Sequence, residues 1–256
     1  MAKEIRQQKK KKRTRLFGGR KDTPGNIRRR FLLASKTGPF QYLEAYNSLR
    51  TNLKFVSMNQ ECRKIIVTSA IPGEGKSSVA INLAVCLAQE GGRVLLVDCD
   101  LRKPVVHRYL RISRIRGKGL TGVLSGTPLE SAIVPVEPLN IHVLAADAIP
   151  PNPAELLGSV RMEQVIEQME HYYDLIIFDT PPVSVVTDAA VLSRYVDGVL
   201  LVVRQNFAAI EQVRLAKRNL EQVNAKILGV VLNQFDAKSA DQDSGYYYSY
   251  QYDYSG

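Results

Sequence analysis

Hydrophobic and polar positions along the chain fall into two kinds of block. Helical spacing of apolar residues predicts helices near 76–90, 153–170 and 208–223. Short runs of consecutive apolar residues predict strands buried on both faces, at 65–67, 94–97, 141–144, 175–178, 199–203 and 227–232. Because buried strands alternate with helices, we expect an α/β fold: a mostly parallel sheet with helices on both faces.

The same patterns divide the chain into three parts. Residues 1–39 combine a lysine run with glycine and proline turns and predict a flexible basic arm. Residues 40–235 form the predicted folded domain, which opens with a helix at 40–56 whose apolar residues recur every three or four positions. Residues 236–256 contain almost no aliphatic side chain, so we expect a disordered tail.

Charge and cysteine content bear on the protein's partners and on its cellular compartment. The net charge of +10 belongs to the arm, since residues 1–30 hold 13 Lys/Arg and two acids. The arm could meet anionic lipid, nucleic acid or an acidic protein surface, but a loose tail is the favoured interpretation, and no nucleic-acid partner is expected. Three cysteines without metal-type spacing, no secretory signal and no membrane-length apolar run predict a cytoplasmic protein.

A glycine-rich loop carries the most specific chemistry. Residues 70–77 fit the phosphate-binding P-loop pattern, apart from Ala70 where a glycine is usual, and they stand between a predicted strand and a predicted helix. Glycines let backbone N–H groups surround phosphate oxygens, a lysine reaches the β/γ-phosphates, and a serine hydroxyl ligates Mg²⁺. The predicted ATP-binding residues are Gly73, Glu74, Gly75, Lys76, Ser77 and Ser78.

Carboxylates follow two of the predicted strands. Asp98, Asp100 and Arg102 follow one strand and Asp179 follows another, and ligands of open α/β sheets sit at these carboxyl ends. Asp179 and Asp98 are candidate metal ligands together with Ser77. If the chain stays extended, Asp98 and Asp100 point the same way, so that one supports the metal and the other accepts a proton.

Arg102 could neutralise charge on a transferring phosphate or pair with an aspartate. Catalysis is therefore assigned to Lys76, Asp98, Asp100, Arg102 and Asp179. These residues predict an ATPase or a kinase and leave the choice open, because both reactions rest on positioning and charge neutralisation.

The tail favours a kinase. Six of the chain's twelve tyrosines lie within nine residues that have no core to join. A tyrosine-rich tail tethered to a phosphoryl-transfer domain is a substrate at high effective concentration. The predicted autophosphorylation sites are Tyr246, Tyr247, Tyr248, Tyr250, Tyr252 and Tyr254.

From about residue 40 to the C-terminus the sequence resembles the bacterial tyrosine kinases (BY-kinases), of the soluble cytoplasmic type found in Gram-positive bacteria. Residues 72–78 resemble their Walker A motif, 95–102 their Walker A′ motif and 176–181 their Walker B motif. The tyrosine cluster lies where that family has one. The resemblance implies a P-loop kinase domain at 40–235 that uses ATP and Mg²⁺.

The resemblance also implies partners. It implies autophosphorylation between neighbouring subunits of an octameric ring and a membrane activator whose cytoplasmic segment recruits the kinase to the inner face of the membrane. It further implies a cognate tyrosine phosphatase and a role in making or exporting capsular or extracellular polysaccharide. The family's oligomerisation motif falls on Glu44, Asn47 and Arg50, where Asn47 replaces an arginine. A solvated helix face explains these three residues equally well.

Two other functions compete with the kinase. A non-kinase ATPase of the partitioning type would use ATP to cycle between monomer and dimer, but the loop lacks a second lysine near its start. A nucleotide-switched scaffold recruited by the basic arm is the third possibility. Asn233, after the last predicted strand, could reach the adenine base or simply occupy a turn.

Overall fold

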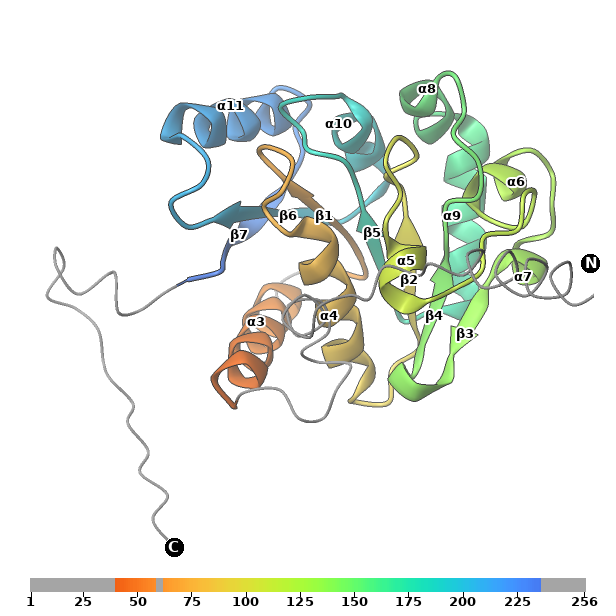
Figure 1. Ribbon diagram of the computed structural model, residues 1–256, viewed down its shortest axis with the longest axis horizontal. Helices are drawn as coiled ribbons and strands as arrows, with labels where there is room; N and C mark the ends of the chain where they lie inside the picture. The colour runs from red at the N-terminus through yellow and green to blue at the C-terminus, as the bar shows by residue number, and fades with distance from the viewer. Residues whose placement is uncertain (1–39, 59–61, 236–256) are drawn as a thin grey trace, which may run out of the picture.

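A seven-stranded sheet organises the molecule (Figure 1), and the computed structural model describes residues 40–58 and 62–235. Its strand order is β3-β4-β2-β5-β1-β6-β7, and every neighbouring pair is parallel except β3 with β4. The strands are β1 Lys64–Ser69, β2 Val94–Asp98, β3 Val134–Val136, β4 Ile141–Leu144, β5 Leu175–Asp179, β6 Gly198–Arg204 and β7 Ile227–Asn233. The predicted α/β class with a mostly parallel sheet is confirmed, whereas the arm at 1–39 and the tail at 236–256 lie outside the described residues.

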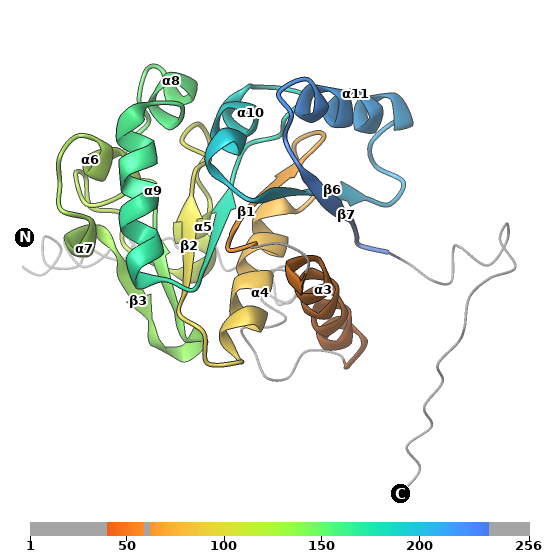
Figure 2. The same cartoon turned by 180° about the vertical axis from the view of Figure 1, so that it is seen from behind.

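Helices cover both faces of the sheet, as Figures 1 and 2 show from opposite sides. The longer ones are α3 Phe40–Met58, α4 Lys76–Ala88, α9 Val160–Tyr172 and α11 Ile210–Glu221. The shorter ones are α5 Val106–Leu110, α6 Leu120–Leu124, α7 Leu129–Ala132, α8 Pro153–Leu157 and α10 Asp188–Leu192, with 3₁₀ turns at Glu137–Leu139 and Ser193–Tyr195. Among the described helices, none has the length and hydropathy to cross a membrane.

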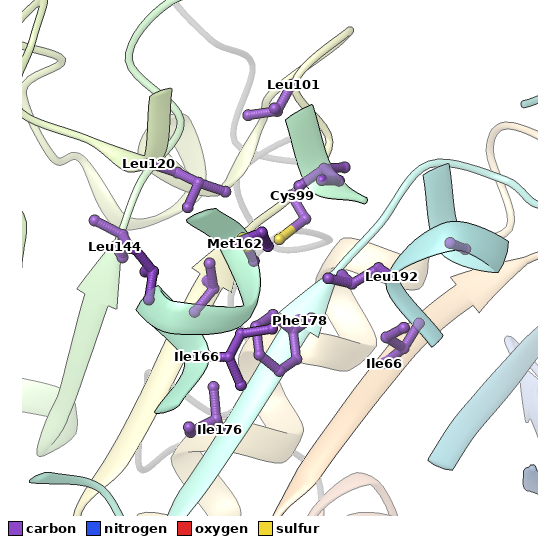
Figure 3. Packing of buried hydrophobic residues seen from close by; sticks show 14 of the residues in the cluster. Ile66, Cys99, Leu101, Leu120, Leu144, Met162, Ile166, Ile176, Phe178 and Leu192 are labelled. Atoms are coloured by element: carbon purple, nitrogen blue, oxygen red, sulfur yellow. The ribbon is translucent and has the colours of Figure 1, made fainter. Parts of the chain in front are cut away.

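Each central strand contributes to two cores because successive side chains point to opposite faces. Ile66 joins the core on one face, while Ile65 and Val67 join the core on the other. Figure 3 shows the first core, where Phe178 of β5 packs among residues that include Ile166 of α9. The second core lies under α4, whose residues 79–88 are all buried because the sheet and α3 both pack against this helix. These two cores hold the carboxyl ends of the strands in fixed positions.

Besides several short helices that were not predicted, two features differ from the sequence-based prediction. The helix expected at 153–170 is split into α8 and α9, because the chain turns at Gly158 and Ser159. The hydroxyl of Ser159 accepts a hydrogen bond from the Met162 N–H at 3.2 Å and caps α9. Strand β3, which was not predicted, is antiparallel and carries Pro135 at the edge of the sheet, where a missing N–H costs nothing.

Candidate active site

The glycine-rich loop lies between β1 and α4, as predicted. Gly73 and Gly75 adopt positive φ angles of 93° and 88°, which glycine tolerates and other residues rarely adopt. Helix α4 begins at Lys76, directly after Gly75, so its free N–H groups and positive dipole end face the loop. Ser77 is nearly buried at the first turn of this helix. The loop therefore presents backbone donors and a lysine to one space, as phosphate binding requires.

Two side chains brace this loop from a distance. The buried Glu74 carboxylate accepts hydrogen bonds from the Ile71 N–H at 2.9 Å and from the Arg204 N–H at 3.3 Å. Asn233 donates from its side-chain amide to the Glu74 carbonyl at 2.7 Å, and a Cβ on Gly75 would collide with that amide. The Glu74 side chain is therefore used inside the protein, and its predicted part in binding ATP falls to its backbone N–H. Asn233 acts as a brace here, a role that sequence reasoning missed.

Asp98 and Asp179 stand side by side as the last residues of β2 and β5, paired in register and fully buried. Burial, followed by repulsion from Asp179, raises the pKa of Asp98 well above its usual value. Burial also raises the pKa of Asp179, although Lys76 opposes this shift. Burial by itself would lower the pKa of Lys76, but Asp179 and Asp100 reverse the effect and raise it. The ionised forms of both aspartates are thus disfavoured by their surroundings, and a bound cation would stabilise them.

The chemistry of Asp179 fits a divalent cation. Both of its carboxylate oxygens are buried without a hydrogen-bond partner in the described structure, and Lys76 Nζ is 3.9 Å from Oδ1. A buried carboxylate left in this state is costly unless a cation or water completes its shell. Among the described residues, no three His, Cys, Asp or Glu side chains form a closed metal cage. Mg²⁺ usually takes only one or two carboxylates and completes its shell with phosphate and water oxygens.

The chain does not stay extended after Asp98, so the condition under which Asp98 and Asp100 would point the same way is not met. Strand β2 ends at Asp98, whose Oδ1 accepts the N–H of Asp100 at 3.2 Å and thereby turns the chain. The other oxygen of Asp98 accepts the Val106 N–H at the start of α5. Asp100 instead faces the P-loop, where its Oδ2 lies 3.0 Å from Lys76 Nζ. Asp98, predicted as a metal ligand, thus has both carboxylate oxygens engaged by backbone N–H groups, so direct metal binding is assigned to Asp179 instead.

Arg102 forms the aspartate pair that the sequence left as one of two alternatives. Its guanidinium donates two hydrogen bonds, at 3.0 and 2.9 Å, to the carboxylate of Asp188 in α10. The Asp188 side chain is fully buried, whereas 39% of the Arg102 side chain is exposed. Asp188 was missed because it follows no strand and belongs to no motif. The pair leaves Arg102 at the wall of the cavity described next.

A cavity of about 790 Å³ opens in front of the loop. Lys76, Ser77, Asp100 and Arg102 line it, and at one wall so do Asn233 and Gln234. Asp98 and Asp179 lie behind this lining, completely covered. The cavity brings together the P-loop, the carboxylate of Asp100 and two residues at the end of β7.

The three residues predicted for oligomerisation lie on α3, and the described contacts are within the chain. The Asn47 amide donates to Glu44 at 2.8 Å on the exposed side of the helix. Arg50 donates to the Cys86 carbonyl at 3.2 Å and pairs with Glu90 at 3.4 Å, so it fastens α3 to the end of α4. Their role between subunits remains a prediction.

A P-loop after β1 with carboxylates ending β2 and β5 defines the class of P-loop NTPases. In agreement, a family model described as "ParA: NUBPL iron-transfer P-loop NTPase" matches residues 61–250. The tyrosine-protein kinase YwqD of Bacillus subtilis (strain 168) is 41% identical over 205 residues, which is 80% of this chain and 85% of YwqD.

Solved structures agree with this comparison. The kinase domain of the Escherichia coli tyrosine kinase ETK gives a TM-score of 0.73 at 36% identity, over 82% of this chain and 80% of that one. The chimerical protein CapA2B2 gives a TM-score of 0.70 at 36% identity, over 74% of this chain and 83% of that one. The chain belongs to the bacterial tyrosine kinase (BY-kinase) family, a group of nucleotide-binding protein-tyrosine kinases.

Proposed function

We propose that this kinase transfers the γ-phosphoryl group of ATP, bound with Mg²⁺, to the tyrosines of its own tail, between subunits. The observation that carries the proposal is the continuity between site and substrate. Asn233 and Gln234 line the cavity in front of the P-loop, and the tyrosine-rich tail begins two residues later at residue 236. A copy's tail is thus tethered close to an active site in any assembly of these domains.

We assign phosphate binding and Mg²⁺ binding to different groups of the P-loop and its surroundings. The N–H groups of residues 73–78 and the start of α4 bind the phosphates. Mg²⁺, held by Ser77 Oγ and Asp179, would neutralise charge on the β- and γ-phosphate oxygens. Lys76 Nζ moves from Asp100 to the phosphates when ATP binds, which frees the Asp100 Oδ2 atom.

Proton transfer is assigned to Asp100, since it is the aspartate of the Walker A′ motif that lines the cavity. Its freed Oδ2 accepts the proton of the attacking tyrosine hydroxyl. The new bond joins the tyrosine oxygen to the γ-phosphorus, and the bond between that phosphorus and the oxygen of ADP breaks. Asp98, whose oxygens are held by backbone N–H groups, keeps this turn in place and adds to the negative charge behind the cation.

The family places this reaction in a cellular setting, which we extend to this chain. We propose assembly as a ring through α3, activation by the cytoplasmic segment of a membrane protein at the inner face of the membrane, and reversal by a tyrosine phosphatase. Regulation of capsular or extracellular polysaccharide is the proposed outcome. Support comes from membership of the tyrosine kinase family and from the match to the CapA2B2 chimera.

One experiment tests the reaction and its direction. A Lys76→Met chain, which keeps all six tail tyrosines, is mixed with an active chain whose six tail tyrosines are changed to phenylalanine. Mg-ATP and the activator's cytoplasmic segment are added, and phosphate is located by mass spectrometry. Phosphotyrosine within 246–254 of the Lys76→Met chain is expected. Fast ATP hydrolysis with an unmodified tail would instead favour the partitioning-type ATPase.

A further inference from the structure

A basic loop borders the active-site cavity, and the reaction described above does not use it. Residues 103–118 contain six Lys/Arg and no Asp or Glu, and all six basic residues are exposed. None of the six forms an ion pair with a described residue. They are Lys103, Arg108, Arg111, Arg114, Arg116 and Lys118. A concentrated, unneutralised positive surface of this kind attracts an anionic partner.

The basic loop is held in one shape despite its lack of regular structure beyond α5. The carboxylate of Asp147 accepts hydrogen bonds from the N–H groups of Gly117 at 2.8 Å and Thr121 at 3.0 Å. The Asp147 carbonyl accepts a further bond from the Arg114 guanidinium at 2.7 Å. Since Asp147 is buried, these bonds fix the loop to the domain. A fixed loop loses less conformational entropy on binding than a mobile one.

Two features relate the basic loop to the active site. Lys103 and Tyr109 line the same cavity as the P-loop, so one end of the loop forms part of the cavity wall. The loop then continues from α5 toward α6, away from β7, as Figure 1 shows. Its apolar residue Ile115 is 53% exposed among the charges. The surface therefore offers positive charge and an apolar contact along a path that ends at the cavity.

The tail has the complementary chemistry. Residues 236–256 contain four aspartates and one lysine, a net charge of −3, with six tyrosines close together. Arginine guanidinium groups stack on tyrosine rings as well as attracting carboxylates. An anionic membrane would satisfy the charges, but it would give no role to the cavity end of the loop.

We propose that the basic loop is the docking surface for the acidic tyrosine tail of a second copy of this chain. The inference rests on the proposed function, in which that tail is the substrate, and adds where the tail binds outside the cavity. Each phosphate adds about −1.5 to −2 charges, so a phosphorylated tail binds more tightly than an unmodified one. Docking of this kind lowers the KM for the tail and leaves the chemical step unchanged.

Binding without ATP tests the docking independently of the reaction. A fluorescent peptide of residues 236–256 is titrated with the full-length chain at low salt, and its anisotropy is measured. In the Arg108→Glu/Arg116→Glu variant we expect affinity to fall about tenfold, because four units of charge are changed at an exposed surface. The matched control is Arg214→Glu/Arg218→Glu, which makes the same charge change on exposed residues of α11. Binding of a fluorescent ADP analogue verifies that both variants are folded.

The outcomes separate the alternatives. Loss of peptide binding in the loop variant alone, with tighter binding of a tyrosine-phosphorylated peptide, supports the proposal even if the tail proves not to be phosphorylated by this enzyme. Equal affinity in both variants, or an equal loss in both, overturns it. Vesicles of 70% phosphatidylcholine and 30% phosphatidylglycerol are tested in parallel. If the loop variant loses vesicle binding and keeps peptide binding, the loop faces a membrane and the proposal is wrong.

Discussion

The Glu74 brace provides the sharpest test of how the P-loop is held. Its carboxylate accepts two backbone hydrogen bonds while buried at 1% exposure. In a Glu74→Gln variant the amide keeps one acceptor oxygen, but its NH₂ group must face the second N–H donor. Hydrogen bonds to a charged group contribute about 1.5–3 kcal/mol, and a buried donor left unpaired costs about 1–3 kcal/mol. We therefore expect a loss of about 2–4 kcal/mol in the free energy of unfolding.

The assay is thermal and urea unfolding of the full-length chain, together with titration of a fluorescent ADP analogue. For a domain of 150–250 residues each kcal/mol shifts the melting temperature by about 2–4 °C, so a fall of roughly 4–16 °C is expected. If 1.4 kcal/mol of this loss falls on the loop conformation that binds the nucleotide, nucleotide affinity should fall about tenfold. The exposed Glu167→Gln is the matched control and should change little. If Glu74→Gln unfolds and binds nucleotide like that control, the brace does not exist.

Four further substitutions test other parts of the domain. Gly75→Ala places a methyl against the bracing amide at φ 88°, so ADP-analogue affinity should fall at least about tenfold, whereas Gly92→Ala, which has open space, should bind normally. Arg102→Ala leaves the buried Asp188 carboxylate without its ion-pair partner and should lower the free energy of unfolding, measured in urea, by about 2–3 kcal/mol. Asp188→Ala, which leaves a part-exposed guanidinium, should cost about 1 kcal/mol; the reverse order would contradict this account. Hydrogen bonds from the side chain and the backbone N–H of Arg93 lower the pKa of Asp174, which precedes β5, to about 2. Asp174→Asn should therefore be less stable than the parent above pH 4, and the gap should close as pH falls to about 2. A gap that widens in acid would refute it.

Local patterns in the sequence were enough to predict much of the fold. The central strands were predicted because each is a short apolar run. Their parallel direction was predicted because a helix lies between successive strands. Asp98 and Asp179 were predicted to lie at the carboxyl ends of the strands, because each directly follows such a run. Short helices and the antiparallel β3 were not predicted, since segments of three to five residues carry too little periodicity.

The sequence by itself determined the nucleotide chemistry, because glycines, a lysine and a serine at this spacing, between a strand and a helix, form the pattern of a phosphate-binding loop. Only the tertiary structure decided which partner each charged side chain takes. Glu74 meets the backbone of a residue 130 positions away, Arg102 meets an aspartate 86 away, and Asn233 reaches a carbonyl 159 away. Such contacts depend on strand order and helix placement, which no local pattern encodes. The same physical reason explains why the sequence did not reveal that the Glu74 side chain braces the P-loop.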